Sequence, residues 1–146
     1  MKKVIPETAI LRVRVDRTKP PQEVLDSLFG RNYTNVKYLA PVPGQGACIE
    51  EVDAHLFPLR NARRYDVSEE YSRRRLCPDV YVLAALQAAD PRLSEWRACV
   101  TQWSNVAGTL LSIRLWQWNG EWHREIEHDG DWGGLYWFIG APVKPL

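Results

Sequence analysis

The sequence predicts a single α+β domain over residues 1–146, in which an antiparallel sheet with a C-terminal β-hairpin or meander packs against two to four short helices. Three patterns predict this class: alternating apolar and charged residues near the start of the chain, a stretch of strong helix formers at 79–89, and an Asn-Gly pair between two strand-like runs. A chain of 146 residues is long enough to bury a hydrophobic core, and it contains no internal repeat or second domain boundary.

The first part of the chain predicts a strand followed by a helix. Residues 8–16 alternate between apolar and polar types, with Val13 and Val15 on the side that would face the core. Two prolines end this strand. The second of them suits the first position of a helix over 21–29, with Gly30 as its C-cap.

The next part of the chain predicts two more strands and a basic helix. The strands are expected at 36–42 and 48–59, and the loop at 41–46 between them lacks the Gly-Lys-Ser/Thr of a phosphate-binding loop. Ser68 is the expected N-cap of the helix, which would carry glutamates in its first turn and Arg73-Arg74-Arg75 in its last. This order complements the helix dipole, so the arginines need no nucleic-acid partner to explain them.

Two further helices are expected before the C-terminal sheet. Pro78 marks the start of a helix over 79–89 that is apolar on both sides and should therefore be buried. After Asp90-Pro91, the stretch 92–103 predicts another short helix, because its large apolar residues follow a helical spacing: Leu93, Trp96, Val100 and Trp103.

The C-terminal sheet is expected to begin with a hairpin at Asn119-Gly120. This pair favours a type I′ turn, which requires positive φ at both positions. A two-residue loop sets Trp118 opposite Glu121 and thereby determines the register of the strands 109–118 and 121–128. The register pairs Leu111 with His128, Ser112 with Glu127, Ile113 with Ile126, Arg114 with Glu125, Trp116 with His123 and Gln117 with Trp122. A third strand is expected at 135–139.

The two faces of this hairpin differ in character. One face is apolar and would cover the core with Leu111, Ile113, Leu115, Trp122 and Ile126. The other face carries Glu127 and the candidate residues for binding a ligand or partner: Arg114, Trp116, Trp118, His123 and Glu125. The polar residues of the second strand are about 6–7 Å apart per step, which is too far for one ion. We therefore expect no metal and no cofactor.

Composition excludes several classes of protein. A net charge of +1 provides no overall field for nucleic acid, and no apolar run approaches the roughly 20 residues of a membrane helix. No secretory signal is apparent, and three widely spaced cysteines without a CxxC pair suggest reduced thiols in a cytoplasmic protein. The seven tryptophans exceed the roughly two of ordinary composition, and tryptophan is used both in cores and at binding surfaces.

Part of the sequence resembles a group of bacterial proteins. The resemblance covers about half of the chain: the helix near Pro78, the run Leu115-Trp116-Gln117-Trp118-Asn119-Gly120-Glu121-Trp122, then Asp131-Trp132 and Tyr136-Trp137-Phe138-Ile139-Gly140. The opening Val15-Asp16-Arg17-Thr18-Lys19-Pro20 is similar in character. These stretches resemble small uncharacterised bacterial accessory proteins of the integron gene-cassette type. The resemblance implies an origin in a mobile genetic element and brings no activity or site residues with it.

Two classes of function follow from the residues. The first is a binding or adaptor protein that uses the Trp-rich sheet face, or a pocket beside it, for a protein partner or a small organic ligand. The alternative is a small enzyme with acid–base chemistry at His123 and Glu125, or with His55 as the base. No nucleophile elbow, zinc signature or phosphate loop supports catalysis, so no catalytic residue is assigned.

The Trp116/Trp118 face also predicts self-association. A contiguous apolar patch is rarely left in water, and a twofold dimer is the commonest way to cover one. Leu110 lies on the same face, and Arg114 with Glu125 would form a polar border. The competing interpretation is that residues 33–59 cover this face within one chain.

Overall fold

The computed structural model describes residues 8–27, 39–40, 48–95, 97–128 and 130–143. Within these ranges, seven strands form one sheet accompanied by three helices and a 3₁₀ helix, which confirms the predicted α+β class. The strands are β1 (Ala9–Asp16), β2 (Ile49–Arg60), β3 (Leu76–Pro78), β4 (Cys99–Ser104), β5 (Leu110–Trp118), β6 (Glu121–His128) and β7 (Leu135–Pro142). The helices are α1 (Pro21–Asp26), α2 (Arg64–Arg73), α3 (Val80–Ala89) and the 3₁₀ helix η2 (Pro91–Glu95).

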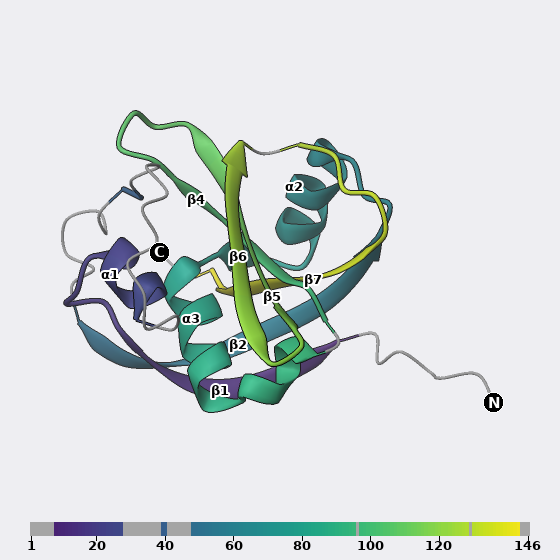
Figure 1. Ribbon diagram of the computed structural model, residues 1–146. Coiled ribbons are helices and arrows are strands. Elements are labelled where there is room, and N and C mark those ends of the chain that lie inside the picture. The colour runs from purple at the N-terminus through teal and green to yellow at the C-terminus, as the bar shows by residue number, and fades with distance from the viewer. Residues whose placement is uncertain (1–7, 28–38, 41–47, 96, 129, 144–146) are drawn as a thin grey trace.

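The sheet has the strand order β1-β2-β7-β4-β5-β6, and β3 pairs with the end of β7. Every neighbouring pair is antiparallel except β4 and β7, which are parallel. The sheet is strongly curved, so that β1 and β2 cross the bottom of the view while β6 rises along its front (Figure 1). No helix in the described ranges has the length and apolar character needed to cross a membrane.

The C-terminal hairpin is confirmed in its predicted register. Each of the six predicted pairs is present, from Leu111 with His128 to Gln117 with Trp122. The turn has φ of 52° at Asn119 and 77° at Gly120. The hairpin follows from the sequence alone because a type I′ turn leaves the register no freedom.

Replacing Gly120 by Val should destabilise the protein by about 1–3 kcal/mol, because a β-branched residue is strained at positive φ. Urea unfolding followed by circular dichroism measures this change. Gly133→Val is the matched control, since Gly133 does not have φ in the left-handed region and a Cβ there meets nothing within 4 Å. An equal effect of the two substitutions would show that turn strain is not the cause.

The strands near both ends of the chain form as predicted, but the sequence did not show which strands they pair with in the sheet. β1 matches the expected 8–16, with Val13 and Val15 buried, and β2 matches the expected 48–59. β7 contains the expected strand 135–139, yet it does not pair with β6. It lies between β2 and β4, so the C-terminal strand runs through the middle of the sheet.

The predicted helix over 92–103 is wrong. Among the described residues of this stretch, the helical ones belong to the 3₁₀ helix η2 (Pro91–Glu95), and Cys99–Ser104 forms the central strand β4. The apolar spacing that suggested a helix also fits a strand, because Cys99 and Val100 are both completely buried on a strand covered on its two faces. The β-branched pair Val100-Thr101 favours the strand.

Two details of the other helices also differ from prediction. The expected N-cap Ser68 lies inside α2. The helix instead begins after Arg63, whose backbone N–H donates to the Asp66 carboxylate at 3.0 Å. Pro78 belongs to β3, and Asp79 caps α3 by accepting from Tyr81 N at 2.9 Å.

Several predictions fall wholly or partly outside the described residues. These are the last part of the first helix with its cap Gly30, the loop at 41–46, and most of the strand at 36–42. From that strand, Leu39 is described and forms a β-bridge with Asn105. Within 33–59, the described residues 49–59 belong to strand β2 of the sheet, which corrects the interpretation that this part of the range covers the Trp116/Trp118 face.

Helices cover both faces of the sheet. α1 and α3 pack on one face over the larger core, which contains Leu25, Leu83, Leu111, Ile113, Leu115 and Ile139. α2 packs on the opposite face over a smaller core of Phe57, Val67, Tyr71, Val100 and Phe138. Figure 1 shows α2 apart from α1 and α3, on the other side of β6 in the view. Four residues of the apolar hairpin face therefore contribute to the larger core, as predicted: Leu111, Ile113, Leu115 and Ile126. The side chain of Trp122 lies outside the described residues.

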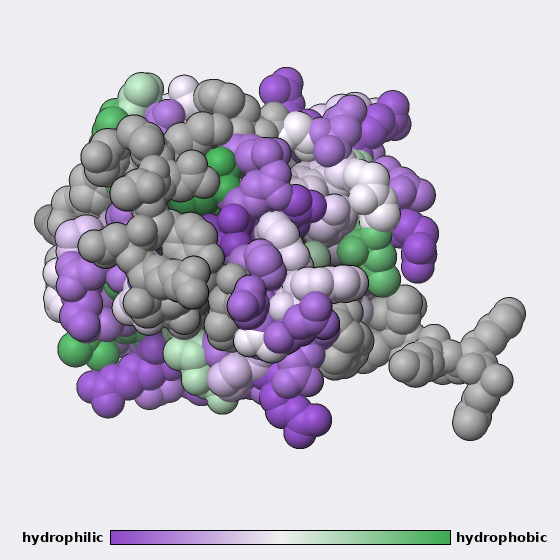
Figure 2. Space-filling model, viewed as in Figure 1, coloured by the Kyte–Doolittle hydropathy of each residue, from purple (hydrophilic) through white to green (hydrophobic). Residues whose placement is uncertain are grey.

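Arg124 interrupts the apolar face of β6. Its side chain is completely buried and forms an ion pair with Asp26 at the end of α1. β6 is the strand at one end of the sheet order, and its other face carries Glu121, Glu125 and Glu127. The described residues at the surface in this view are mainly hydrophilic, with scattered apolar residues among them (Figure 2). Charges on an edge strand oppose pairing with another sheet.

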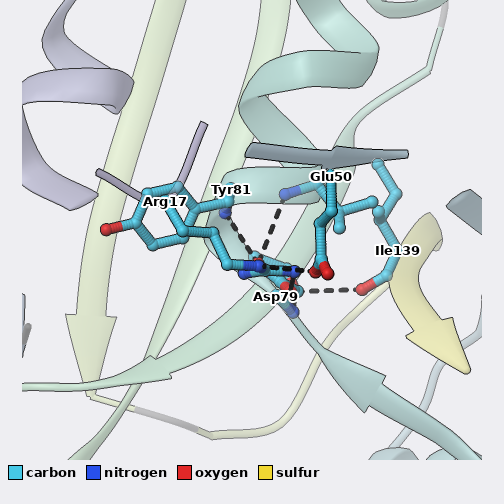
Figure 3. A network of polar contacts seen from close by, with 7 residues as sticks. Arg17, Glu50, Asp79, Tyr81 and Ile139 are labelled. Carbon is cyan, nitrogen blue, oxygen red and sulfur yellow. Dashed lines mark hydrogen bonds and ion pairs between the residues drawn. The ribbon is translucent and has the colours of Figure 1, made fainter. Parts of the chain in front are cut away.

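A buried polar network joins β1, β2 and the start of α3. Arg17 donates to Asp79 at 2.7 Å and to Glu50 at 3.0 Å, and its guanidinium points toward both carboxylates (Figure 3). Thr101 accepts from the backbone N–H of Asp79 and donates to the carbonyl of Ile139, each at 2.9 Å. Burial disfavours the charge on Arg17, but Asp79 and then Glu50 outweigh it and raise the pKa of Arg17. The network therefore stabilises the junction of α3 with the sheet.

Candidate functional site

The described residues cover only part of the width of the sheet face that carries α2. Val100 on β4 is opposite Arg114 on β5, and Arg114 is opposite Glu125 on β6, so these side chains share the α2 face. Val100 belongs to the smaller core beneath α2, whereas Arg114 and Glu125 are only partly buried. The β5–β6 end of this face is therefore available for polar groups and pockets.

Arg114 lies at the centre of this uncovered face. Its guanidinium forms an ion pair with Glu125 and donates to the hydroxyl of Tyr136 at 2.8 Å. The guanidinium carbon also lies 4.8 Å from the ring centre of Trp116 and 5.4 Å from that of Tyr136. Three neighbours on three strands hold this side chain in one orientation.

His123 lies against Trp116 at the same face. The two rings stack with their centres 5.4 Å apart and an interplanar angle of 16°. Trp116 thus contacts both the guanidinium of Arg114 and the imidazole ring of His123. Glu125, the other half of the predicted acid–base pair, is engaged by Arg114.

Two adjoining pockets flank Arg114 and Tyr136. The smaller, which we call the Trp132 pocket, has a volume of about 140 Å³ and is lined by residues including Glu125, Glu127, Asp131 and Trp132. The larger, the Trp116 pocket, has a volume of about 420 Å³ and is lined by Glu95, Arg97, Ala98, Trp116 and Gln117. Arg114 and Tyr136 line both pockets, so they form the wall that the pockets share.

The Trp132 pocket is closed on one side by the segment between β6 and β7. Trp132 contacts Tyr136 with ring centres 5.0 Å apart at 61°, and its ring also packs against Phe138. Asp131 accepts from the backbone N–H of Arg64 at 3.0 Å, which ties the segment to the first residue of α2. The site therefore depends on α2 and β7 as well as on the hairpin.

Several buried polar atoms around the site have no hydrogen-bond partner among the described residues. They are Nε of Arg114, Nε2 of His123 and Nε1 of Trp132. A buried polar atom without a partner costs about 1–3 kcal/mol relative to one that is hydrogen-bonded. Two of these three residues, Arg114 and Trp132, line the pockets.

The structure brings most of the predicted site residues together. Arg114, Trp116 and Glu125 line the pockets, and His123 stacks behind Trp116. Trp118 lines neither pocket and is 67% exposed at the end of β5. Sequence reasoning missed Trp132, Tyr136 and Arg97. Alternation along 135–139 indicates that Tyr136 and Phe138 share a face, but only the pairing of β7 with β4 places Tyr136 beside Arg114.

Two further residues with a lowered pKa are His55 and Arg97, and neither is placed to act as a base in these pockets. Burial lowers the pKa of His55, which lies on β2 and lines neither pocket. Burial also lowers the pKa of Arg97, although a guanidinium stays protonated at neutral pH.

In the described part of the chain, no group of three or more His, Cys, Asp or Glu side chains is placed to hold a metal ion. Of the three free cysteines, only Cys99 is buried, whereas Cys77 is exposed.

Comparison of the chain with protein-family models, with curated proteins and with solved structures finds no match.

Proposed function

We propose that this protein binds a small organic ligand in the two pockets on either side of Arg114 and Tyr136. The observation that carries the proposal is the combination of aromatic walls with buried polar atoms that lack partners in the described residues. Ligand pockets typically combine apolar and aromatic lining with a few well-placed polar groups. The β5–β6 face has both.

The rigidity of Arg114 supports the proposal. Its ion pair with Glu125, its hydrogen bond to Tyr136 and its contact with Trp116 hold the guanidinium before any ligand arrives. A side chain that is already ordered loses little conformational entropy on binding. An isolated surface ion pair would lack the additional contacts that Arg114 makes with Tyr136 and Trp116.

The proposal is tested by a thermal-shift screen of neutral sugars, organic cations, carboxylates and nucleotides. A ligand at a hundredfold its dissociation constant stabilises the folded state by about 2.7 kcal/mol, which shifts the melting temperature of a small domain by several degrees. Trp116→Ala should weaken binding of any ligand found by about tenfold, because Trp116 lines the larger pocket. Trp118→Ala is the matched control on the same strand face, outside both pockets.

Two results would contradict the proposal. One is the absence of a stabilising ligand across the four classes of compound. The other is an equal loss of binding in Trp116→Ala and Trp118→Ala, which would place the ligand elsewhere.

The competing function, acid–base catalysis by His123 with Glu125, has less support. Glu125 forms an ion pair with Arg114, and His123 stacks on Trp116 with its Nε2 unpartnered among the described residues. A general base needs a reacting group within hydrogen-bond reach and is usually oriented by a second group. Neither His123 nor Glu125 has that arrangement with the other.

Self-association through the Trp116/Trp118 face is a second proposal. Trp118 is 67% exposed, and tryptophan is enriched at protein interfaces. Leu110 is 41% exposed but lies eight positions away at the opposite end of β5, about 26 Å along the strand. The contact would therefore centre on Trp118. Light scattering at micromolar concentration tests it, and a monomer at all accessible concentrations would exclude it.

A further inference from the structure

We propose that the Trp132 pocket binds the cationic group of a small organic amine or guanidine. This inference rests on the proposed ligand-binding function and names the class of ligand. It follows from the charges, the aromatic surfaces and the size of this one pocket.

The lining of the Trp132 pocket is anionic after its internal ion pair is taken into account. Three carboxylates, those of Glu125, Glu127 and Asp131, face one guanidinium, that of Arg114. The ion pair neutralises Arg114 with Glu125. Glu127 and Asp131 form no ion pair with a cationic side chain in the described ranges, although one oxygen of Asp131 accepts from Arg64 N. These two carboxylates would repel an anionic ligand in the pocket and attract a cationic one.

The ring of Trp132 provides a second reason for a cation. Trp132 and Tyr136 meet edge to face with their centres 5.0 Å apart and both line the pocket, and the guanidinium of Arg114 already lies 5.4 Å from the centre of the Tyr136 ring. The faces of aromatic rings carry negative potential and attract ammonium and guanidinium groups, most strongly when water is excluded. Glu127 lies on β6, so carboxylate and aromatic groups reach the pocket from different elements.

The volume of the pocket limits the ligand to a small head group. The pocket has about 140 Å³, and an apolar cavity of about 150 Å³ is enough to hold benzene. A trimethylammonium or guanidinium group fits this space, with the rest of the molecule extending toward the adjoining Trp116 pocket.

The test compares choline and agmatine with 3,3-dimethylbutan-1-ol, which has the shape of choline without its charge. Isothermal titration at low and high salt measures each affinity on the full chain. We expect at least one of the two cations to bind at least tenfold more tightly than the neutral alcohol, and its affinity to fall as salt rises. Binding of both cations no tighter than that of the alcohol would overturn the inference.

The matched pair of variants is Glu127→Gln and Glu121→Gln. Both remove one exposed carboxylate from the same face of β6, but only Glu127 lines the pocket. Glu127→Gln should weaken cation binding about fivefold, and Glu121→Gln should leave it unchanged. An equal effect of both variants would reduce the result to general surface charge and overturn the inference.

The outcomes also separate this inference from the proposed function. Suppose that a neutral sugar or a carboxylate binds tightly, that Trp116→Ala abolishes this binding, and that no cation binds. This result would refute the cation inference and leave the proposed ligand-binding function standing. No binding in any class would refute both.

Discussion

Replacing Asp79 by Ala should destabilise the protein by about 3–5 kcal/mol, the cost of breaking a buried ion pair by removing one partner. The side chains of Arg17 and Asp79 are 11% and 10% exposed, so the loss of Asp79 leaves Arg17 with only the partly exposed Glu50. The same substitution removes the acceptor of the backbone N–H groups of Tyr81 and Val82, which begin α3. Urea unfolding measures the total.

Two other substitutions divide this effect into its causes. Asp79→Asn keeps a good N-cap but removes the charge, so it should cost less than Asp79→Ala. Asp53→Ala breaks an exposed ion pair with Arg12, whose side chains are 46% and 62% exposed, and should cost no more than about 1 kcal/mol. A cost of Asp79→Ala as small as that of Asp53→Ala would show that the buried network contributes little.

Replacing Phe138 by Ala should destabilise the protein by about 3–5 kcal/mol, through lost burial and a cavity. Phe138 is completely buried at the centre of the smaller core. Its ring contacts those of Phe57, Tyr71 and Trp132, with centres 6.0, 6.4 and 5.8 Å away. The substitution therefore loosens both the packing of α2 and one wall of the Trp132 pocket.

Hydrogen exchange distinguishes a local effect from a general one. Amides of α2 should exchange faster in Phe138→Ala, beyond the change in global stability, while those of α3 on the opposite face should follow global stability alone. Leu110→Ala is the control on a partly exposed β5 residue, with an expected cost below about 1 kcal/mol. Uniform acceleration across both helices would contradict the division into two cores.

Local patterns were sufficient for most of the elements. The hairpin at Asn119-Gly120 was correct to the residue because the turn and its strands are adjacent in sequence. β1 was predicted from alternation and α3 from helix propensity. The stretch 92–103 was misread because an apolar segment buried on both faces has the same spacing as a helix.

Interactions distant in sequence were not predictable from such patterns. Arg124 lies at a position that alternation assigns to the apolar face, and its burial depends on Asp26, 98 residues earlier. The network of Arg17, Glu50 and Asp79 likewise joins three separate segments. Nothing in the local sequence around any one of these residues identifies its partner.

The sequence by itself determined which residues share the polar face of the hairpin, because register follows from a two-residue turn and side chains alternate along a strand. Only the tertiary structure decided that this face carries two pockets. β7 enters the sheet beside β4 and places Tyr136 against Arg114, while the segment before it places Trp132 and Asp131 beside Glu127. These placements depend on pairing between strands far apart in the chain and on the packing of α2, which no local pattern encodes.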